Sequence, residues 1–156
     1  MRKIRAMSIS DLDEIDSLEQ EIFKQSSWTK EDYLNELQNN PFAFYFVVEQ
    51  DNVIVGYAGL AIAYENAEIL TIATHPDYRR QNIAKMMMDY MISQVIQANC
   101  LSFSLEVRQS NIPAIALYES YGFKKVAKRP NYYLDGESAD LMIKEMGEKY
   151  DFIASN

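Results

Sequence analysis

The sequence has few of the residues on which several kinds of protein depend. Its 156 residues include one cysteine, one histidine, five glycines and four prolines. Cys100 can form no disulfide within the chain, and no Cys/His cluster could hold a structural zinc ion, so we expect no metal site. His75 precedes Pro76, and no nucleophile elbow accompanies it, which argues against a Ser-His-Asp triad. We expect Cys100 to be a small buried residue in a reducing compartment.

Long apolar runs and a basic surplus are also missing. The longest apolar stretches are as short as strands, and the N-terminal MRKIRAMSIS lacks an apolar segment of signal-peptide length. We therefore expect a cytoplasmic protein without a membrane partner. The chain has 15 basic and 23 acidic residues, a net charge of −8. This balance argues against general nucleic-acid binding and is compatible with a basic substrate.

The composition is that of a globular domain, with 48% hydrophobic and 24% charged residues. A chain of this length is large enough to bury a core. We expect one domain over residues 1–146 and a C-terminal tail over 147–156. We also expect a monomer or a weak dimer.

Hydrophobic spacing predicts an alternation of strands and helices. Thr29 as N-cap would place Asp32 at N3, a variant of the capping box, with Trp28 and Tyr33 at the positions of a hydrophobic staple. The predicted order is strand, two helices, three strands, helix, strand, helix and two strands. This order implies an α/β (α+β) fold, a mixed sheet of about seven strands with helices on both faces. The strands are expected near 2–7, 42–50, 52–64, 67–74, 101–107, 123–129 and 138–146, and the helices near 10–23, from 29, at 83–98 and at 111–121.

The stretch PDYRRQNIAK, residues 76–85, joins a predicted strand to a long helix and is a candidate anion site. The first N–H groups of a helix have no internal partner, and the helix dipole is positive at that end. Arg79, Arg80 and Lys85 would strengthen the attraction, and a pyrophosphate is the natural ligand. The glycines and the Lys-Ser/Thr pair of a P-loop are absent. A solvated basic turn before an amphipathic helix remains an alternative explanation.

This turn resembles the acyl-CoA loop of the GNAT superfamily of N-acetyltransferases, whose motif is Arg/Gln-x-x-Gly-x-Gly/Ala. The matching residues here run from Arg79 to Ala84, with Asn82 in place of the usual glycine. Asparagine is the non-glycine residue that best tolerates a left-handed backbone, so the turn could keep its shape.

A second stretch, LSFSLEVRQSNIPAIALYESYGF, resembles the following part of the same superfamily. It is most similar to the bacterial RimI type, which acetylates the N-terminal alanine of a small-subunit ribosomal protein. The segments LEVR, SN, ALYE and GF carry the resemblance, together with ILTIATHPDYRR before the loop and NYY at 131–133. The likeness covers roughly residues 40–146 and implies a GNAT-type, mostly antiparallel sheet.

The resemblance implies acetyl transfer from acetyl-CoA to an amine. It implies Glu106 as general base, directly or through a water, and Tyr118 as the acid that protonates the leaving thiolate. A neutral amine is needed for attack, and at pH 7 its deprotonation costs about 1 kcal/mol for an α-amine but over about 4 kcal/mol for a lysine. A modest base is therefore sufficient for an N-terminal acceptor.

The resemblance also implies the residues that bind the two substrates. Main-chain groups on the strand before the loop would stabilise the oxyanion and contact the donor. The implied donor-binding residues are Ile72, Ala73, Thr74, Arg79, Arg80, Gln81, Asn82, Ile83, Ala84, Lys85 and Asn111. The implied acceptor-binding residues are Trp28, Tyr132 and Tyr133. Glu68, on the neighbouring predicted strand, could also reach the amine and is a reserve base.

Several of these residues have simpler explanations. Glu106 could be a surface glutamate paired with Arg108. Asn111 could serve as a helix cap alone, or as a cap and a donor contact together. Tyr132 and Tyr133 could be exposed aromatic residues without a function. Trp28 could serve as the hydrophobic staple of its helix and nothing more, and Tyr118 could be an ordinary packed aromatic. The acceptor could be a polyamine, an aminoglycoside or a free amino acid, and the chain could be a non-catalytic acyl-CoA-binding module.

Overall fold

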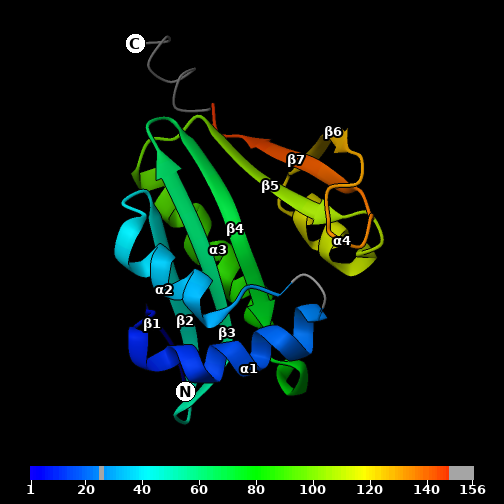
Figure 1. The fold of residues 1–156 in the computed structure, drawn as a ribbon. Helices are drawn as coiled ribbons and strands as arrows, with labels where there is room; N and C mark the ends of the chain where they lie inside the picture. The colour runs from blue at the N-terminus through cyan, green and yellow to red at the C-terminus, as the bar shows by residue number, and fades with distance from the viewer. Residues whose placement is uncertain (25–26, 148–156) are drawn as a thin grey trace. The chain divides into compact units, whose positions relative to one another are not determined.

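The computed structural model describes residues 1–24 and 27–147, which form a seven-stranded sheet and four α-helices (Figure 1). The order of elements predicted from hydrophobic spacing is confirmed. The predicted tail, 147–156, lies outside the described residues from residue 148 onward. In chain order the elements are β1 (Arg2–Ala6), η1 (Ile9–Asp11), α1 (Leu12–Phe23), α2 (Lys30–Asn39), β2 (Ala43–Gln50), β3 (Val53–Ala63), β4 (Asn66–Thr74), η3 (Pro76–Tyr78), α3 (Ile83–Gln97), β5 (Ser102–Arg108), α4 (Ile112–Ser120), β6 (Lys124–Arg129) and β7 (Ala139–Glu145).

The strands hydrogen-bond in the order β1-β2-β3-β4-β5-β7-β6, which confirms a mixed, mostly antiparallel sheet. The pairs β1·β2, β2·β3, β5·β7 and β6·β7 are antiparallel. The pair β4·β5 is parallel, and its register runs only from Asn66↔Ser102 to Glu68↔Ser104. The inversion of β6 and β7 makes β6 an edge strand.

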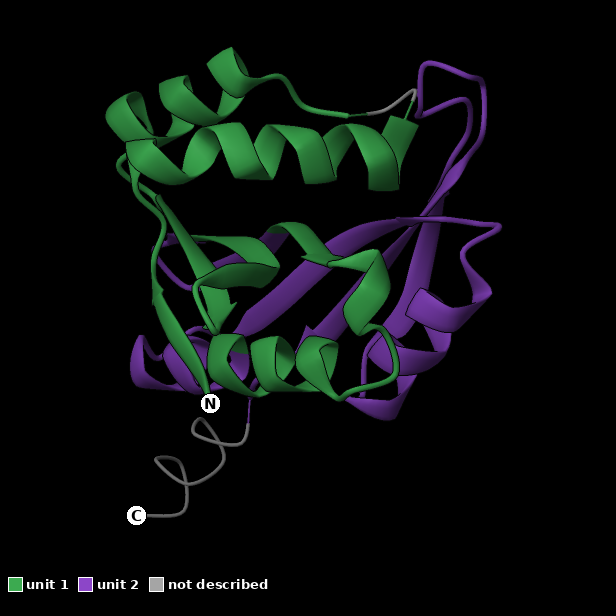
Figure 2. Cartoon of the chain, turned by 90° about the horizontal axis from the view of Figure 1, so that it is seen from below, with its two compact units in different colours: residues 1–61, 70–91 green, residues 62–69, 92–156 purple. Residues whose placement is uncertain are grey.

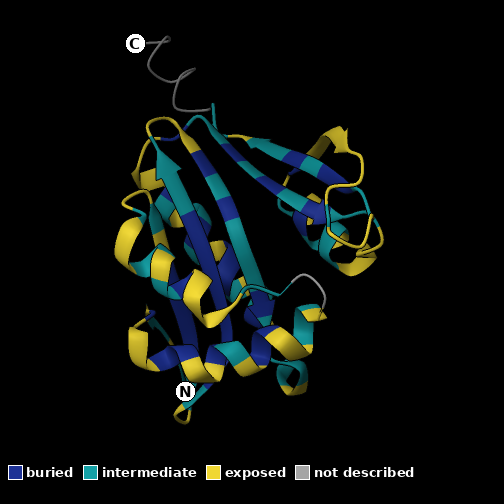
Figure 3. Ribbon diagram, viewed as in Figure 1, coloured by how far each residue is buried: buried dark blue, intermediate teal, exposed yellow. Residues whose placement is uncertain are grey.

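The chain divides into two compact units, coloured separately in Figure 2. The first comprises residues 1–61 and 70–91, and the second residues 62–69 and 92–156. Buried residues lie in both units, as the colours of Figure 3 indicate.

In the first unit, helices cover both faces of the strands. One face packs against α1 and α2, where Leu12, Ile15 and Tyr33 join a buried cluster with strand residues such as Val47. The other face packs against α3. There the β3 backbone comes so close to the helix that a Cβ on Gly56 would lie 2.8 Å from Ile83 Cγ2. A larger residue at Gly56 would force the side chains of Ile83 and Met87 on α3 to shift.

Local signals at the start of α2 are confirmed. The Thr29 hydroxyl accepts from the Asp32 N–H at 3.0 Å, and the Asp32 carboxylate accepts from the Thr29 N–H at 2.8 Å, which is the predicted capping box. The rings of Trp28 and Tyr33 lie 5.1 Å apart, as a staple requires. The predicted turn between β2 and β3 is also present, with Asp51 and Asn52 at positive φ.

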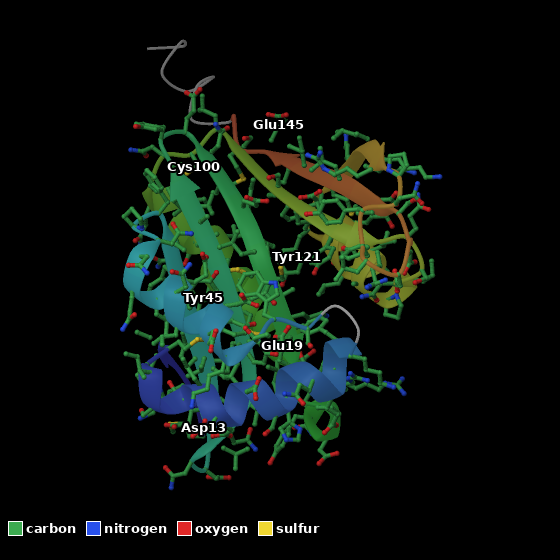
Figure 4. The ribbon with its side chains drawn as sticks, viewed as in Figure 1. Asp13, Glu19, Tyr45, Cys100, Tyr121 and Glu145 are labelled. Carbon is green, nitrogen blue, oxygen red and sulfur yellow. The ribbon has the colours of Figure 1, made fainter. Side chains whose placement is uncertain are left out.

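A buried glutamate, Glu19, ties α1 to its neighbours. Its side chain is 2% exposed, and one oxygen accepts from the hydroxyls of Tyr33 at 2.7 Å and Tyr57 at 2.8 Å. The other oxygen accepts from the Trp28 N–H at 2.9 Å. Figure 4 labels Glu19 on α1 and Tyr45 on β2 in this unit. The carboxylate therefore fixes the chain just before α2 against α1 and β3.

In the second unit, β5 alternates as predicted. Phe103, Leu105 and Val107 are buried on one face, and the residues between them are less buried. Phe123, after α4, packs against Phe103 with ring centroids 5.3 Å apart. Cys100 is 3% exposed, which confirms that it is a buried residue.

We predict that Glu19→Ala lowers the free energy of unfolding by about 3–5 kcal/mol. The change leaves two tyrosine hydroxyls and one backbone N–H buried without their acceptor. Urea unfolding monitored by circular dichroism measures the effect. The matched control is Glu21→Ala, an exposed position on the same helix, for which we expect a change within about 0.5 kcal/mol. Equal stability of the two variants would contradict a structural role for the Glu19 carboxylate.

Candidate active site

The predicted donor-binding turn lies in the first unit, between η3 and α3. Arg79, Arg80, Gln81 and Asn82 are exposed there, and Ile83 is buried as the first residue of α3. Asn82 has a φ of 65°, so the asparagine adopts the left-handed backbone expected of the missing glycine. Arg80 also has a positive φ, 64°, which the sequence did not indicate.

Arg2, at the start of β1, holds this turn in place. Its guanidinium donates to the Gln81 carbonyl and to the Gln81 side-chain oxygen, each at 2.8 Å, and to Gln50 on β2 at 2.8 Å. The Asn82 carbonyl accepts from the Met86 N–H at 3.0 Å as α3 begins. The carbonyls of Gln81 and Asn82 thus accept hydrogen bonds from other groups of the protein. The fifteen-residue helix α3 begins directly after the turn.

The remaining donor-binding predictions fall on β4 and α4. Ala73 is buried on β4, between the partly exposed Ile72 and Thr74. Asn111 is the N-cap of α4, and its side chain accepts from the Ala114 N–H at 3.3 Å, so the capping explanation is confirmed. Ala84 is partly buried and Lys85 is exposed in the first turn of α3.

In the second unit, the polar face of β5 gathers the predicted catalytic carboxylate and its neighbours. Ser102, Ser104, Glu106 and Arg108 alternate with the buried residues of the strand and therefore share one face. Ser104 is paired with Glu68 on β4, so Glu68 belongs to the same polar surface. The two carboxylates predicted as base and reserve base are thereby brought together.

Glu106 is held at both oxygens by the hairpin of β6 and β7. Tyr132 donates its hydroxyl to Glu106 Oε1 at 3.2 Å, and Arg129 Nε lies 2.5 Å from Oε2. Oε2 is nonetheless buried without a correctly directed hydrogen bond among the described residues. The Glu106 side chain is 15% exposed, against 51% for Arg129. The candidate base therefore contacts a half-exposed arginine, and the hydrogen-bonding capacity of its Oε2 is not fully used by the described residues.

The surroundings of Glu68 change the pKa of its carboxyl group. Burial raises the pKa of the Glu68 carboxyl, the charge of Glu106 raises it further, and Arg129 opposes the shift. A raised carboxyl pKa next to a second carboxylate is typical of sites that bind or move protons.

Arg108 does not pair with Glu106, although the two residues share a face. Its guanidinium donates instead to Asp135 at 2.9 and 3.1 Å and to Glu137 at 2.9 Å. These carboxylates lie in the loop between β6 and β7, and they offer the fork of the guanidinium several acceptors at once. The possibility of a Glu106–Arg108 pair, raised by their spacing in the sequence, is wrong.

The same arginine orders the loop that presents the two adjacent tyrosines. The Arg108 guanidinium carbon lies 4.0 Å from the centre of the Tyr133 ring, a cation–π contact. Glu137 also accepts from the Ser110 N–H at 2.9 Å, and hydrogen bonds from Ser110 and Arg108 lower its pKa. Tyr133 packs against Arg108, and the neighbouring Tyr132 donates its hydroxyl to Glu106.

Tyr118 lies on α4 with 6% of its surface exposed. Burial raises the pKa of its hydroxyl far above the ordinary value of 10, with a contribution from Tyr133. The Tyr133 pKa is itself raised to about 12, mainly by burial. Both phenols are therefore protonated at neutral pH and can donate a proton or a hydrogen bond.

Sequence reasoning missed the arginines that organise these positions. Arg2 is 79 residues from Gln81, and Arg129 is 23 residues from Glu106, so no local pattern could pair them. Only the strand order and register place Arg129 on the same face as Glu106.

The structure combines a mixed sheet, a turn with left-handed residues before a long helix, and a glutamate on the strand that follows this helix. A family model described as the Acetyltransferase (GNAT) family matches residues 11–123. The chain belongs to the GNAT family of acetyltransferases and is an N-acetyltransferase enzyme.

Individual relatives agree with this family. A Bacillus subtilis protein named "putative ribosomal protein bS18-alanine N-acetyltransferase" is 37% identical over 140 residues, covering 89% of this chain and 92% of the relative. The crystal structure of the ribosomal-protein-S18-alanine N-acetyltransferase from Escherichia coli superposes with a TM-score of 0.84 at 29% identity, covering 94% of each chain. Arabidopsis thaliana NAA60, solved in complex with acetyl-CoA, shares the fold with a TM-score of 0.82 at 19% identity, over 94% of this chain and 99% of that chain.

Over the described residues, we find no helix with the length and apolar character that crossing a membrane demands.

We predict that Arg108→Met loosens the β6–β7 loop. The change removes the hydrogen bonds to Asp135 and Glu137 and the cation–π contact with Tyr133. The backbone amides of Tyr133 and Gly136, which close the loop on itself, should exchange with deuterium about tenfold faster or more. Lys124→Met, an exposed change on β6, is the matched control and should leave both rates unaltered. Unchanged exchange in Arg108→Met would show that the loop does not depend on the arginine.

Proposed function

We propose that this enzyme transfers acetyl from acetyl-CoA to the N-terminal α-amino group of a protein, such as a ribosomal protein. In this proposal Glu106 is the general base and Tyr118 the general acid. The observation that carries it is the state of Glu106, a largely buried carboxylate that accepts from Tyr132 at one oxygen. Its other oxygen contacts Arg129 and has no hydrogen bond of good geometry among the residues that the structure describes. The name of the B. subtilis relative, which this chain matches over most of its length, supports the choice of acceptor.

The turn at residues 79–85 fits the diphosphate of the donor. Main-chain N–H groups at the start of α3 and the positive end of its dipole are suited to an anion, and Arg79 and Arg80 are exposed beside them. The left-handed backbone of Asn82 maintains the turn. Arg2 donates to the Gln81 carbonyl oxygen, which reduces the repulsion that this oxygen would exert on a bound anion. We assign the ranges 72–74 and 79–85, together with Asn111, to donor binding.

The chemistry needs a base for a modestly basic amine. Attack of the amine nitrogen on the thioester carbonyl forms the C–N bond, and Glu106 accepts the proton released from nitrogen, directly or through a water. Main-chain N–H groups at Ile72 to Thr74 would stabilise the oxyanion. The C–S bond then breaks, and the sulfur of CoA leaves with a proton or a hydrogen bond from Tyr118.

The raised pKa of Tyr118 refines its role. A thiol has a pKa near 8.5, so transfer of a proton from a phenol with a pKa above 10 to the thiolate is uphill. A hydrogen bond from Tyr118 to the sulfur as the charge develops is the more favourable form of acid catalysis.

The acceptor itself is selected near the acidic surface of β4 and β5. Glu68 and Glu106 attract a cationic amine, and Tyr132 and Tyr133 supply aromatic surface beside them. A small-molecule amine would meet the same charges, so the preference for a protein N-terminus rests on the relatives. A ribosomal-protein acceptor would place the enzyme in the cytoplasm.

We predict that Glu106→Gln reduces kcat/KM by about 10²-fold or more, because the amide cannot accept the proton. The assay is the release of free CoA from acetyl-CoA and a peptide that begins with alanine. Acetyl-CoA binding, measured by calorimetry, should stay unchanged.

Glu119→Gln, which removes an exposed carboxylate on α4, provides the control and should keep full activity. Wild-type rates in Glu106→Gln would rule out Glu106 as the base. Absence of turnover by the wild-type enzyme on any alanine peptide, with activity on another amine, would instead overturn the proposed acceptor.

We predict that Tyr118→Phe lowers kcat about 10- to 100-fold without moving the limbs of the pH–rate profile. A phenol whose pKa is raised keeps its proton at every pH below that value, so the acid form is fully present through pH 9. The wild-type rate should rise towards pH 8 as the α-amine loses its proton and should not fall before pH 9.5. A wild-type decrease between pH 8 and 9.5 that disappears in Tyr118→Phe would contradict the raised pKa.

A further inference from the structure

Arg129 is the cationic side chain that contacts the proposed base. Its Nε lies 2.5 Å from Glu106 Oε2, and half of its side chain is exposed. β6 is an edge strand whose residues are all exposed, so nothing on the far side of β6 in the sheet order confines the arginine. Any cationic group that approaches Glu106 Oε2 would therefore meet the charge of Arg129.

Register explains how Arg129 reaches Glu106. Arg129 pairs with Ala139 on β7, and Glu106 pairs with Leu141 on the same strand. Residues paired or two apart on neighbouring strands point to the same face, so the arginine extends across β7 to β5. Lys128, the preceding residue, points to the opposite face of the same strand.

The local charge count is one cation against two anions. Glu68 and Glu106, when both are ionised, contribute −2, and Arg129 contributes +1, which leaves −1. Arg108, the other arginine of this surface, is already committed to Asp135 and Glu137. The remaining charge of −1 matches one arriving α-ammonium group and leaves no carboxylate for the second charge of a polyamine.

We propose that Arg129 determines acceptor specificity by excluding amines that keep a second positive charge close to the reacting nitrogen. This inference rests on the proposed function and extends it. An α-amine without a basic neighbour becomes neutral when it reacts and then carries no charge against Arg129. A polyamine retains at least one ammonium group a few bonds away, and this group meets the guanidinium instead of a free carboxylate.

A local filter is needed because the whole-molecule field does not discriminate. A net charge of −8 attracts every cationic amine at long range, a polyamine most strongly. Screening limits that attraction to roughly 8 Å at physiological salt, and within this distance the fixed charges at the site decide. Repulsion of the wrong ligand by a fixed charge is a common source of specificity.

The experiment compares kcat/KM for an alanine peptide without basic residues with kcat/KM for spermidine, in the wild type and in Arg129→Gln. We expect the wild type to prefer the peptide and Arg129→Gln to shift the ratio at least tenfold towards spermidine. Arg129→Lys, which keeps the charge, should restore the preference. Lys128→Gln, which removes a charge from the opposite face of the strand, should leave the ratio unchanged.

The outcomes separate the two proposals. A wild type that acetylates the peptide, with the same ratio in Arg129→Gln, overturns the role of Arg129 and leaves the proposed function intact. An equal loss on both acceptors in Arg129→Gln also overturns it, because the arginine would then only support the hairpin. A wild type that acetylates spermidine and not the peptide overturns the proposed acceptor, and the inference with it.

Discussion

The alternation of β5 is the constraint on which the rest of the second unit depends. Burial of Phe103, Leu105 and Val107 on one face forces Ser104, Glu106 and Arg108 onto the other. A slip of one residue would place the carboxylate in the apolar core, where an isolated charge is strongly disfavoured. The packing of the core thus holds Glu106 at the surface that the β6–β7 hairpin covers.

Arginines contact the candidate functional positions of this acidic protein. Arg2 engages the turn before α3, Arg108 orders the loop that bears Tyr132 and Tyr133, and Arg129 contacts Glu106 directly. Arg2 uses all three guanidinium nitrogens, which a lysine could not reproduce, whereas Arg129 contacts Glu106 through Nε alone. The negative net charge is therefore misleading about the site, because short-range contacts rather than the total charge determine what happens there.

Much of the fold could be predicted from the sequence because its signals are local. The capping box at Thr29, the turn at Asp51 and Asn52, the left-handed Asn82 and the buried face of β5 each depend on a few neighbouring residues. The candidate residues Glu106, Tyr132 and Tyr133 were also identifiable through motifs shared with a known family, and Glu68 through its place on the neighbouring predicted strand. The partners of those residues were not, and the expected neighbour Arg108 binds other carboxylates.

The sequence by itself determined the order of strands and helices, the two faces of β5 and the backbone shape of the turn at Asn82, since hydrophobic period and residue conformation act over a few residues. Only the tertiary structure decided that Glu19 is a buried acceptor for two tyrosines and that Arg129 reaches Glu106 across β7. Those contacts depend on which strands become neighbours and in which register. Sheet order and register come from the packing of the whole chain, and no short stretch of sequence carries them.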